Sequence, residues 1–400
     1  MTADVGAVRA SPVASGAINR FESLAYAHLG DPLASNVTRL PHPALLIGTA
    51  WFVLTVGFDL LLTIPRGTFL SAPPAFIGWW VDFATVLQEV FVFPLLAFFY
   101  VWAPRALLRA IRSLREQDIV TVRPEDEAWL AEASAGRRPR WIARFLPAGW
   151  LLAYVVLVAG VCAALLFWTY TSSLQGKLWF ADPEVARVKV IFWFLNSYMA
   201  IWLIVRMSIL ITLLARLFGS DRDVAIEPLH PDGAGGLAPL SSFSLRLTAF
   251  IGLISATFVL VERNYFFQNK LQLTVQAIPV HAIAVFALVT SAFVFFAPLV
   301  APHRIMATAK RERLSDLSRQ FRAIERQIDP ANLDTLTGAA PKLQLIRSVY
   351  AEIERFPVWP FDTRILRFFF VAVLGQPILA VAIDIFKGDL KEFAKVILGG

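Results

Sequence analysis

The feature that most constrains this chain is a series of apolar stretches, each about 20 residues long and carrying few charges. A helix rises about 1.5 Å per residue, so each stretch can cross a hydrocarbon core about 30 Å thick. Charged residues make up only 17% of the chain, whereas soluble domains usually contain about 25%. These observations exclude an ordinary soluble enzyme and predict an all-α, polytopic helical membrane protein.

We expect about seven transmembrane helices, and no strand pattern competes with them. Their approximate ranges are 43–64, 84–103, 147–170, 189–217, 245–262, 277–300 and 365–386. The predicted organisation begins with a cytoplasmic N-terminal segment at 1–42, followed by spans one and two within 43–103 and a basic loop at 104–146. Spans three to six lie within 147–300, with a glycine-rich cytoplasmic loop at 219–244. A cytoplasmic helical hairpin at 301–361 then leads into the last span and a short tail at 362–400.

The positive charges predict the orientation, because Lys and Arg are retained in short loops on the cytoplasmic side. Segments 104–146 and 301–361 are rich in arginine, so both are expected to be cytoplasmic, with the N-terminus inside and the C-terminus outside. Lys387, Lys391 and Lys395 in the tail conflict with this orientation, which leaves open whether the seventh span crosses fully. The net charge of +7 lies mainly beside the spans, where it favours anionic lipids over nucleic acid as a partner.

Helical spacing of apolar residues predicts further helices on the cytoplasmic side. After the second span, the spacing predicts a helix that either continues from the membrane or lies on it. Its apolar residues are Leu107, Leu108, Ile111 and Leu114. After the sixth span, a coiled-coil seam of two heptads that ends at Asp329-Pro330 is formed by Leu314, Leu317, Phe321, Ile324 and Ile328. A second helix from Pro341 carries on one face Ile346, Val349, Tyr350 and Ile353. The sequence leaves open whether this hairpin packs within one chain or joins subunits of a homo-oligomer.

Ionisable side chains inside spans are costly, so each one is a functional hypothesis. Five of them fall in the outer part of the membrane in the predicted topology: Asp59, Glu89, Glu262, His281 and Asp384. Carboxylates that face a water-filled vestibule attract cations, so this layer predicts a cation pathway. The alternative is that several of these groups only touch the outer head groups. For His281 two interpretations stay open: a proton carrier or metal ligand, or a hydrogen-bonded packing residue.

Arg206 lies deeper, in the fourth span, and needs a partner. The candidates are a carboxylate of the outer layer, Gln376, backbone carbonyls, or a lipid phosphate reached by the long side chain. Gln376 lies beside Pro377, which interrupts the seventh span, and Pro94 similarly interrupts the second. Interrupted helices offer freed carbonyls to ions or polar substrates, and the alternative is a kink that only serves packing.

A polar loop before the fifth span, at 228–237, is rich in turn-forming residues. Its candidate residues are His230, Asp232, Gly233, Gly235 and Gly236. Three interpretations stay open: backbone amides that cradle an anion, a metal site completed by Asp221 and Asp223, or a structural turn packed on neighbouring helices. No lysine of the phosphate-loop type follows and no strand precedes it, and we expect no cofactor.

The loop sequence PLHPDGAGGL at 228–237 and the sequence WPFD at 359–362 resemble a pair of motifs in a family of bacterial multi-pass inner-membrane proteins. The resemblance covers these two motifs and the general layout of the chain. It implies a location in the bacterial inner membrane and brings no activity with it.

Two hypotheses of function compete at this point. The first is an oligomeric cation channel or transporter with an outer acidic vestibule formed by Asp59, Glu89 and Asp384, and a constriction near Gln376. The second is a membrane-anchored sensor or scaffold that engages a soluble cytoplasmic partner through its hairpin and glycine-rich loop. An enzyme is not expected, because the sequence contains no Ser-His-Asp arrangement, HExxH motif or paired-carboxylate repeat.

Overall fold

The structure is a computed structural model of the chain, and it describes residues 31–37, 40–70, 77–117, 119, 150–173, 179–218, 230, 232, 234–262, 278–328, 333–360, 367, 370 and 371. Within these ranges the chain is helical and forms no extended strand. The elements are α2 (Pro32–Val37), α3 (Pro43–Thr63), α4 (Phe83–Leu87), η1 (Gln88–Val92), α5 (Phe93–Glu116), α8 (Trp150–Ser173), η2 (Trp179–Ala181), α9 (Pro183–Leu217), α10 (Ala238–Glu262), α11 (Ile278–Glu325) and α12 (Leu333–Arg355).

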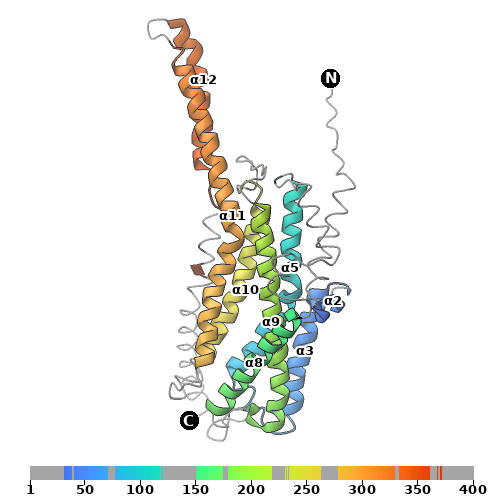
Figure 1. Cartoon of the computed structure of the whole chain (residues 1–400). Coiled ribbons are helices and arrows are strands. Elements are labelled where there is room, and N and C mark those ends of the chain that lie inside the picture. The colour runs from blue at the N-terminus through green and yellow to red at the C-terminus, as the bar shows by residue number, and fades with distance from the viewer. Residues whose placement is uncertain are drawn as a thin grey trace, which may run out of the picture.

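The long helices form one elongated bundle, from which the α11–α12 hairpin projects at one end (Figure 1). Within the described part of the chain, five helical segments are long and apolar enough to cross a membrane: Pro43–Thr63, Thr85–Ile111, Trp150–Trp168, Glu184–Ile209 and Ala292–Glu325. A shorter apolar helix covers Ala238–Ile254. The predicted all-helical membrane architecture is therefore supported, while the count of seven spans and the orientation stay predictions. Nearly all of the seventh span lies outside the described residues.

The outer surface of the bundle is apolar, as a lipid-facing surface must be. Leu61 on α3 is 73% exposed and Leu157 on α8 is 66% exposed. Water would disfavour such a surface, because each exposed apolar area costs free energy until it is covered. A hydrocarbon environment removes this cost, so the pattern agrees with a membrane location.

One of the two predicted alternatives for the segment after the second span is confirmed, and one helix boundary differs from the expected one. The helix of the second span continues to Glu116, and Leu107 and Leu114 are buried on it. Helix α12 begins at Leu333, and Pro341, which we expected near its start, lies inside it. The helix accommodates this proline because the residue lies on an exposed face, where a local bend disturbs no packing.

The α11–α12 hairpin is tied back to the bundle where α12 ends. Lys310 on α11 donates hydrogen bonds to the carbonyl oxygens of Glu354 at 2.6 Å and Phe356 at 2.8 Å. The rings of His303 and Trp359 stack with centroids 4.0 Å apart. The segment after α12 therefore packs against the adjoining part of α11 as a defined elbow.

Close packing of α3 against α5 depends on a glycine. A Cβ atom added at Gly48 would lie 3.1 Å from the carbonyl oxygen of Pro94 and 3.3 Å from Cβ of Phe98. By contrast, a Cβ atom at Gly57 on the same helix would have nothing within 4 Å. A side chain at residue 48 would therefore require α3 and α5 to move apart by a few tenths of an ångström.

We expect Gly48→Val to lower the free energy of unfolding by about 1–3 kcal/mol, because the added methyl groups overpack the α3–α5 contact. Gly57→Val is the matched control and should change it by less than about 0.5 kcal/mol, because the side chain points into open space. Denaturant titration of the purified protein in detergent micelles measures both. Equal stability of the two variants would contradict the contact.

Candidate functional site

Two carboxylates and one ammonium group meet at the end of the bundle farther from the hairpin. Asp59 comes from α3, Glu89 from η1 and Lys189 from α9, and their exposed fractions are 1%, 2% and 4%. The Lys189 ammonium donates to Oδ2 of Asp59 at 2.6 Å and to Oε1 of Glu89. We call these three residues the acidic cluster. The structure therefore brings together two residues that the sequence analysis had selected, and adds a lysine that it had not.

Aromatic side chains close the acidic cluster off from water. The indole N–H of Trp79 points at both carboxylates, 2.8 Å from Oε2 of Glu89 and 3.1 Å from Oδ2 of Asp59. The Lys189 ammonium lies 4.7 Å from the centroid of the Trp179 ring. Such a low-dielectric setting strengthens the interactions between charges, and it raises the free-energy cost of a charge that has no opposite charge beside it.

Local backbone geometry positions the two aromatic residues and Glu89. The N–H of Trp179 donates to the carbonyl of Ile77 at 2.9 Å, which joins the two loops that carry the tryptophans. Glu89 lies in a π-helical turn just before Pro94, which has no N–H to donate. Single π-turns inside α-helices are rare and occur often at functional sites.

Among the residues that the structure describes, the charges of the acidic cluster do not balance. Two carboxylates face one ammonium, which leaves a net charge of −1 when all three groups are ionised. Oδ1 of Asp59 is buried and has no hydrogen-bond partner among the described residues. The cluster can therefore take up one more positive charge, at an oxygen that is free to accept it.

A second buried ion pair lies farther along α9, about 25 Å from Lys189 at 1.5 Å per residue. The Arg206 guanidinium donates to Oδ2 of Asp31, which also accepts from the hydroxyl of Tyr100. Oδ1 of Asp31 accepts from the hydroxyl of Tyr198 at 2.9 Å and from the N–H of Leu33 at 3.1 Å. This pair is balanced one to one, and its carboxylate is well supplied with donors, so it is a structural connection.

Sequence reasoning missed both new partners, for different reasons. Asp31 lies in a polar N-terminal segment that we expected to stay outside the bundle, and Lys189 marks only the start of the expected fourth span. A signal for Asp31 was present, because an Asp followed by Pro32 is a typical helix start, and α2 begins there. Of the partners considered for Arg206, a backbone carbonyl is confirmed, that of Tyr100 at 3.4 Å.

Other residues of the predicted cation pathway are only partly described. Glu262 ends α10 and His281 lies in the first turn of α11, but their side chains lie outside the described residues. Gln376 and Asp384 lie outside them entirely. The structure thus joins two of the five groups, Asp59 and Glu89, through Lys189. The layer of all five ionisable groups stays a prediction.

The glycine-rich loop folds around one carboxylate. Oδ1 of Asp232 accepts from the N–H groups of Ala234 and Gly236, both at 2.9 Å, and Oδ2 accepts from Ala238 at 3.1 Å. Burial raises the pKa of this carboxyl group, but these backbone donors outweigh it and hold the pKa below its usual value. The Nδ1 atom of His230 lies 2.8 Å from Oδ1. Asp232 thus closes the turn that leads into α10.

Glycine is required in this turn. Gly235 and Gly236 have φ angles of 65° and 88°, which other residues rarely adopt. A Cβ atom at Gly236 would lie 1.8 Å from Cδ1 of Ile119. Gly233, Asp221 and Asp223 lie outside the described residues, within which no group of three metal-ligating side chains occurs. Among the three interpretations, the described residues agree with the structural turn.

Comparison of the chain with protein-family models, curated proteins and solved structures gives no match.

We expect Asp31→Asn to lower the free energy of unfolding by about 3–5 kcal/mol, because it leaves the buried guanidinium of Arg206 without its counter-charge. Asparagine still caps helix α2, so the change isolates the charge. Adding Arg206→Met should restore part of this loss, since both charges are then gone. A double-mutant cycle by denaturant titration measures the coupling, and purely additive losses would contradict the ion pair.

The lowered pKa of Asp232 predicts how the loop responds to acid. A carboxyl group whose pKa is lower in the folded state stabilises the fold above its unfolded pKa of about 3.9, and this contribution is lost as the pH falls through the folded value. The rate at which a protease cleaves the loop should therefore stay constant from pH 8 to pH 5, because Asp232 keeps its charge and its hydrogen bonds over this range. Asp232→Ala should accelerate cleavage at every pH, and a rate that rises already between pH 7 and pH 5 would contradict this assignment.

Proposed function

We propose that the protein is a cation transporter or channel of the proton-coupled type, and that the acidic cluster of Asp59, Glu89 and Lys189 is its proton-binding site. The observation that supports this is the imbalance of two buried carboxylates against one ammonium, with Oδ1 of Asp59 left open. Buried carboxylates within membrane spans are typical of proton relays in pumps and transporters.

Energetics favour the exchange of a single proton. In a low dielectric, a net charge of −1 costs several kcal/mol, and protonation of one carboxylate removes it. Deprotonation then becomes favourable only when water or a substrate reaches the cluster. A site that holds its proton in one state and releases it in another is the requirement for coupling.

A proton fits the site better than a metal cation does. Hard cations surround themselves with several oxygen ligands, whereas within the described part of the chain only Oδ1 of Asp59, among the carboxylate oxygens of the cluster, has no hydrogen-bond partner. The position between the carboxylates is already held by the Lys189 ammonium, which repels a second cation. Protonation of Asp59 needs no additional ligand.

The setting of this function is part of the same proposal. The predicted orientation, with the hairpin on the cytoplasmic side, puts the acidic cluster in the outer half of the membrane. The two motifs that resemble bacterial multi-pass proteins support a bacterial inner membrane. Arginine-rich segments beside the spans support contact with anionic lipids, and assembly as a homo-oligomer remains part of this proposal.

Proton uptake by proteoliposomes that hold a pH-sensitive dye tests the proposal directly. A potassium diffusion potential, negative inside, should drive proton entry through the wild-type protein. We expect Asp59→Asn to reduce the rate at least about tenfold, because it removes the exchangeable charge and leaves a balanced Lys189–Glu89 pair. A tenfold loss corresponds to about 1.4 kcal/mol, which is small compared with the cost of a buried net charge.

Glu184→Gln is the matched control, because this carboxylate lies on α9 near Lys189, pairs with Arg66 at 2.5 Å, and is 71% exposed. Its proton uptake should equal that of the wild type. Infrared titration of the protonated carboxyl band provides a second measurement on the folded protein, and the band should disappear in Asp59→Asn. Unchanged uptake in Asp59→Asn, or no uptake by the wild type at any voltage, would contradict the proposal.

A sensor or scaffold is the second candidate, and the construction of the hairpin favours it. Helix α11 continues without a break from the membrane-compatible segment into the hairpin. The hydroxyl of Ser241 on α10 donates to the carbonyl of Pro360, beyond α12. A shift of the spans would therefore move the hairpin as well.

A distance measurement separates the two candidates. Spin labels on the native Cys162 of α8 and on Gly338→Cys of α12, where a side chain meets nothing within 4 Å, report the position of the hairpin. A sensor of lipid thickness or tension should show a distance that changes between thin and thick bilayers. A proton transporter without this role should show a constant distance together with proton uptake.

A further inference from the structure

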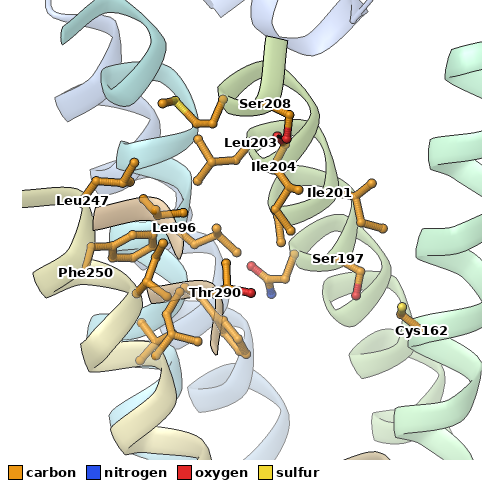
Figure 2. A pocket seen from close by; sticks show the side chains of 18 of the residues that line it. Leu96, Cys162, Ser197, Ile201, Leu203, Ile204, Ser208, Leu247, Phe250 and Thr290 are labelled. Atoms are coloured by element: carbon orange, nitrogen blue, oxygen red, sulfur yellow. Dashed lines mark hydrogen bonds between the residues drawn. The ribbon is translucent and has the colours of Figure 1, made fainter. Parts of the chain in front are cut away.

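A cavity of about 340 Å³ lies among η1 and helices α5, α8, α9, α10 and α11. Its lining includes Gln88, the chain neighbour of Glu89, but none of the three residues of the acidic cluster. Figure 2 shows its two sides, with Cys162 of α8 facing Ser197 and Ile201 of α9, and with Leu96 and Phe250 on other helices. Nearly all of its lining is apolar. Its volume lies in the range of sites that bind small molecules, which begins at about 300 Å³.

The cavity is elongated. Its lining residues on α9 run from Trp193 to Ile211, a length of about 27 Å at 1.5 Å per residue. A compact polar solute would leave most of this length unfilled. The shape and the apolar walls together suit a long hydrocarbon chain that lies along α9.

One end of the cavity carries an unused hydrogen-bond donor. Asn196 lines the cavity and is 5% exposed, and its Oδ1 atom accepts from the indole N–H of Trp51 at 3.0 Å. An indole N–H can only donate, which fixes the orientation of the amide group. The Nδ2 atom is buried and has no acceptor among the described residues.

We propose that this cavity binds a membrane-dissolved molecule with a long apolar chain and a carbonyl oxygen, which accepts a hydrogen bond from Nδ2 of Asn196. A plain hydrocarbon would leave the donor unsatisfied, which costs free energy in an apolar setting. The carbonyl group belongs to a quinone or to an acyl ester, and both present the same acceptor. This inference stands independently of the proton-transport proposal, because it uses none of the residues of the acidic cluster.

Photoaffinity labelling of the full-length protein in lipid nanodiscs tests it. The probe is an alkylated benzophenone, whose carbonyl is both the hydrogen-bond acceptor and the photoreactive group. Cross-links mapped by mass spectrometry should concentrate on lining residues next to Asn196, such as Trp193 and Ser197, and not at the Ile211 end. Decylubiquinone and methyl palmitate should compete for the site, and the stronger competitor identifies the source of the carbonyl. Hexadecane should compete about tenfold less well.

Asn196→Leu keeps the size of the side chain and removes the donor, so it should lower the cross-link yield near residue 196 by about tenfold. Ser208→Ala is the matched control, because this lining hydroxyl already donates to the carbonyl of Ile204 at 2.9 Å, and its yield should not change. Three results would overturn the proposal: unchanged labelling in Asn196→Leu, equal competition by hexadecane and the carbonyl compounds, or no labelling of the wild type because another segment of this chain fills the cavity.

Discussion

The rest of this structure depends on one constraint, that a charge buried away from water must find an opposite charge. Helix α9 carries two such charges, Lys189 and Arg206, each almost completely buried. Lys189 draws α3 and η1 toward α9 through Asp59 and Glu89. Arg206 holds α2 to α9 through Asp31, about 25 Å farther along the helix. The two cations of α9 thus fix where α2, α3 and η1 meet this helix.

The two clusters obey the same constraint and differ in outcome. Asp31 meets one cation and several hydroxyl and backbone donors, so this site is complete. In the acidic cluster the carboxylates outnumber the cation among the described residues, within which one oxygen of Asp59 has no partner. A pair with balanced charges stabilises the fold and has no net charge to neutralise by taking up an ion. An unbalanced one has a charge to gain, which is why our functional proposal rests on it.

Different kinds of contact surround these clusters along the length of the molecule. Tryptophan side chains of two loops cover the acidic cluster, and an apolar cavity runs along α9. At the other end, the turn closed by Asp232 leads into the start of α10, and the elbow near Trp359 packs on His303 in the middle of α11. The proposed proton site, the proposed lipophilic-ligand site and the hairpin elbow therefore rest on different residues, and single substitutions can test each of them.

The sequence by itself determined the helical membrane architecture, because apolar length and sparse charge leave a chain no other stable arrangement in hydrocarbon. It also identified Asp59, Glu89, Arg206 and Asp232 as residues that need explanation, since a charge in an apolar stretch, or a turn-forming carboxylate among glycines, is visible locally. Only the tertiary structure decided their partners. In the sequence, Lys189 is separated from Asp59 by 130 residues and from Glu89 by 100 residues, and Asp31 is separated from Arg206 by 175 residues. Periodicity shows which face of a helix is apolar, but pairing between distant segments depends on how the helices pack, and no local pattern records it.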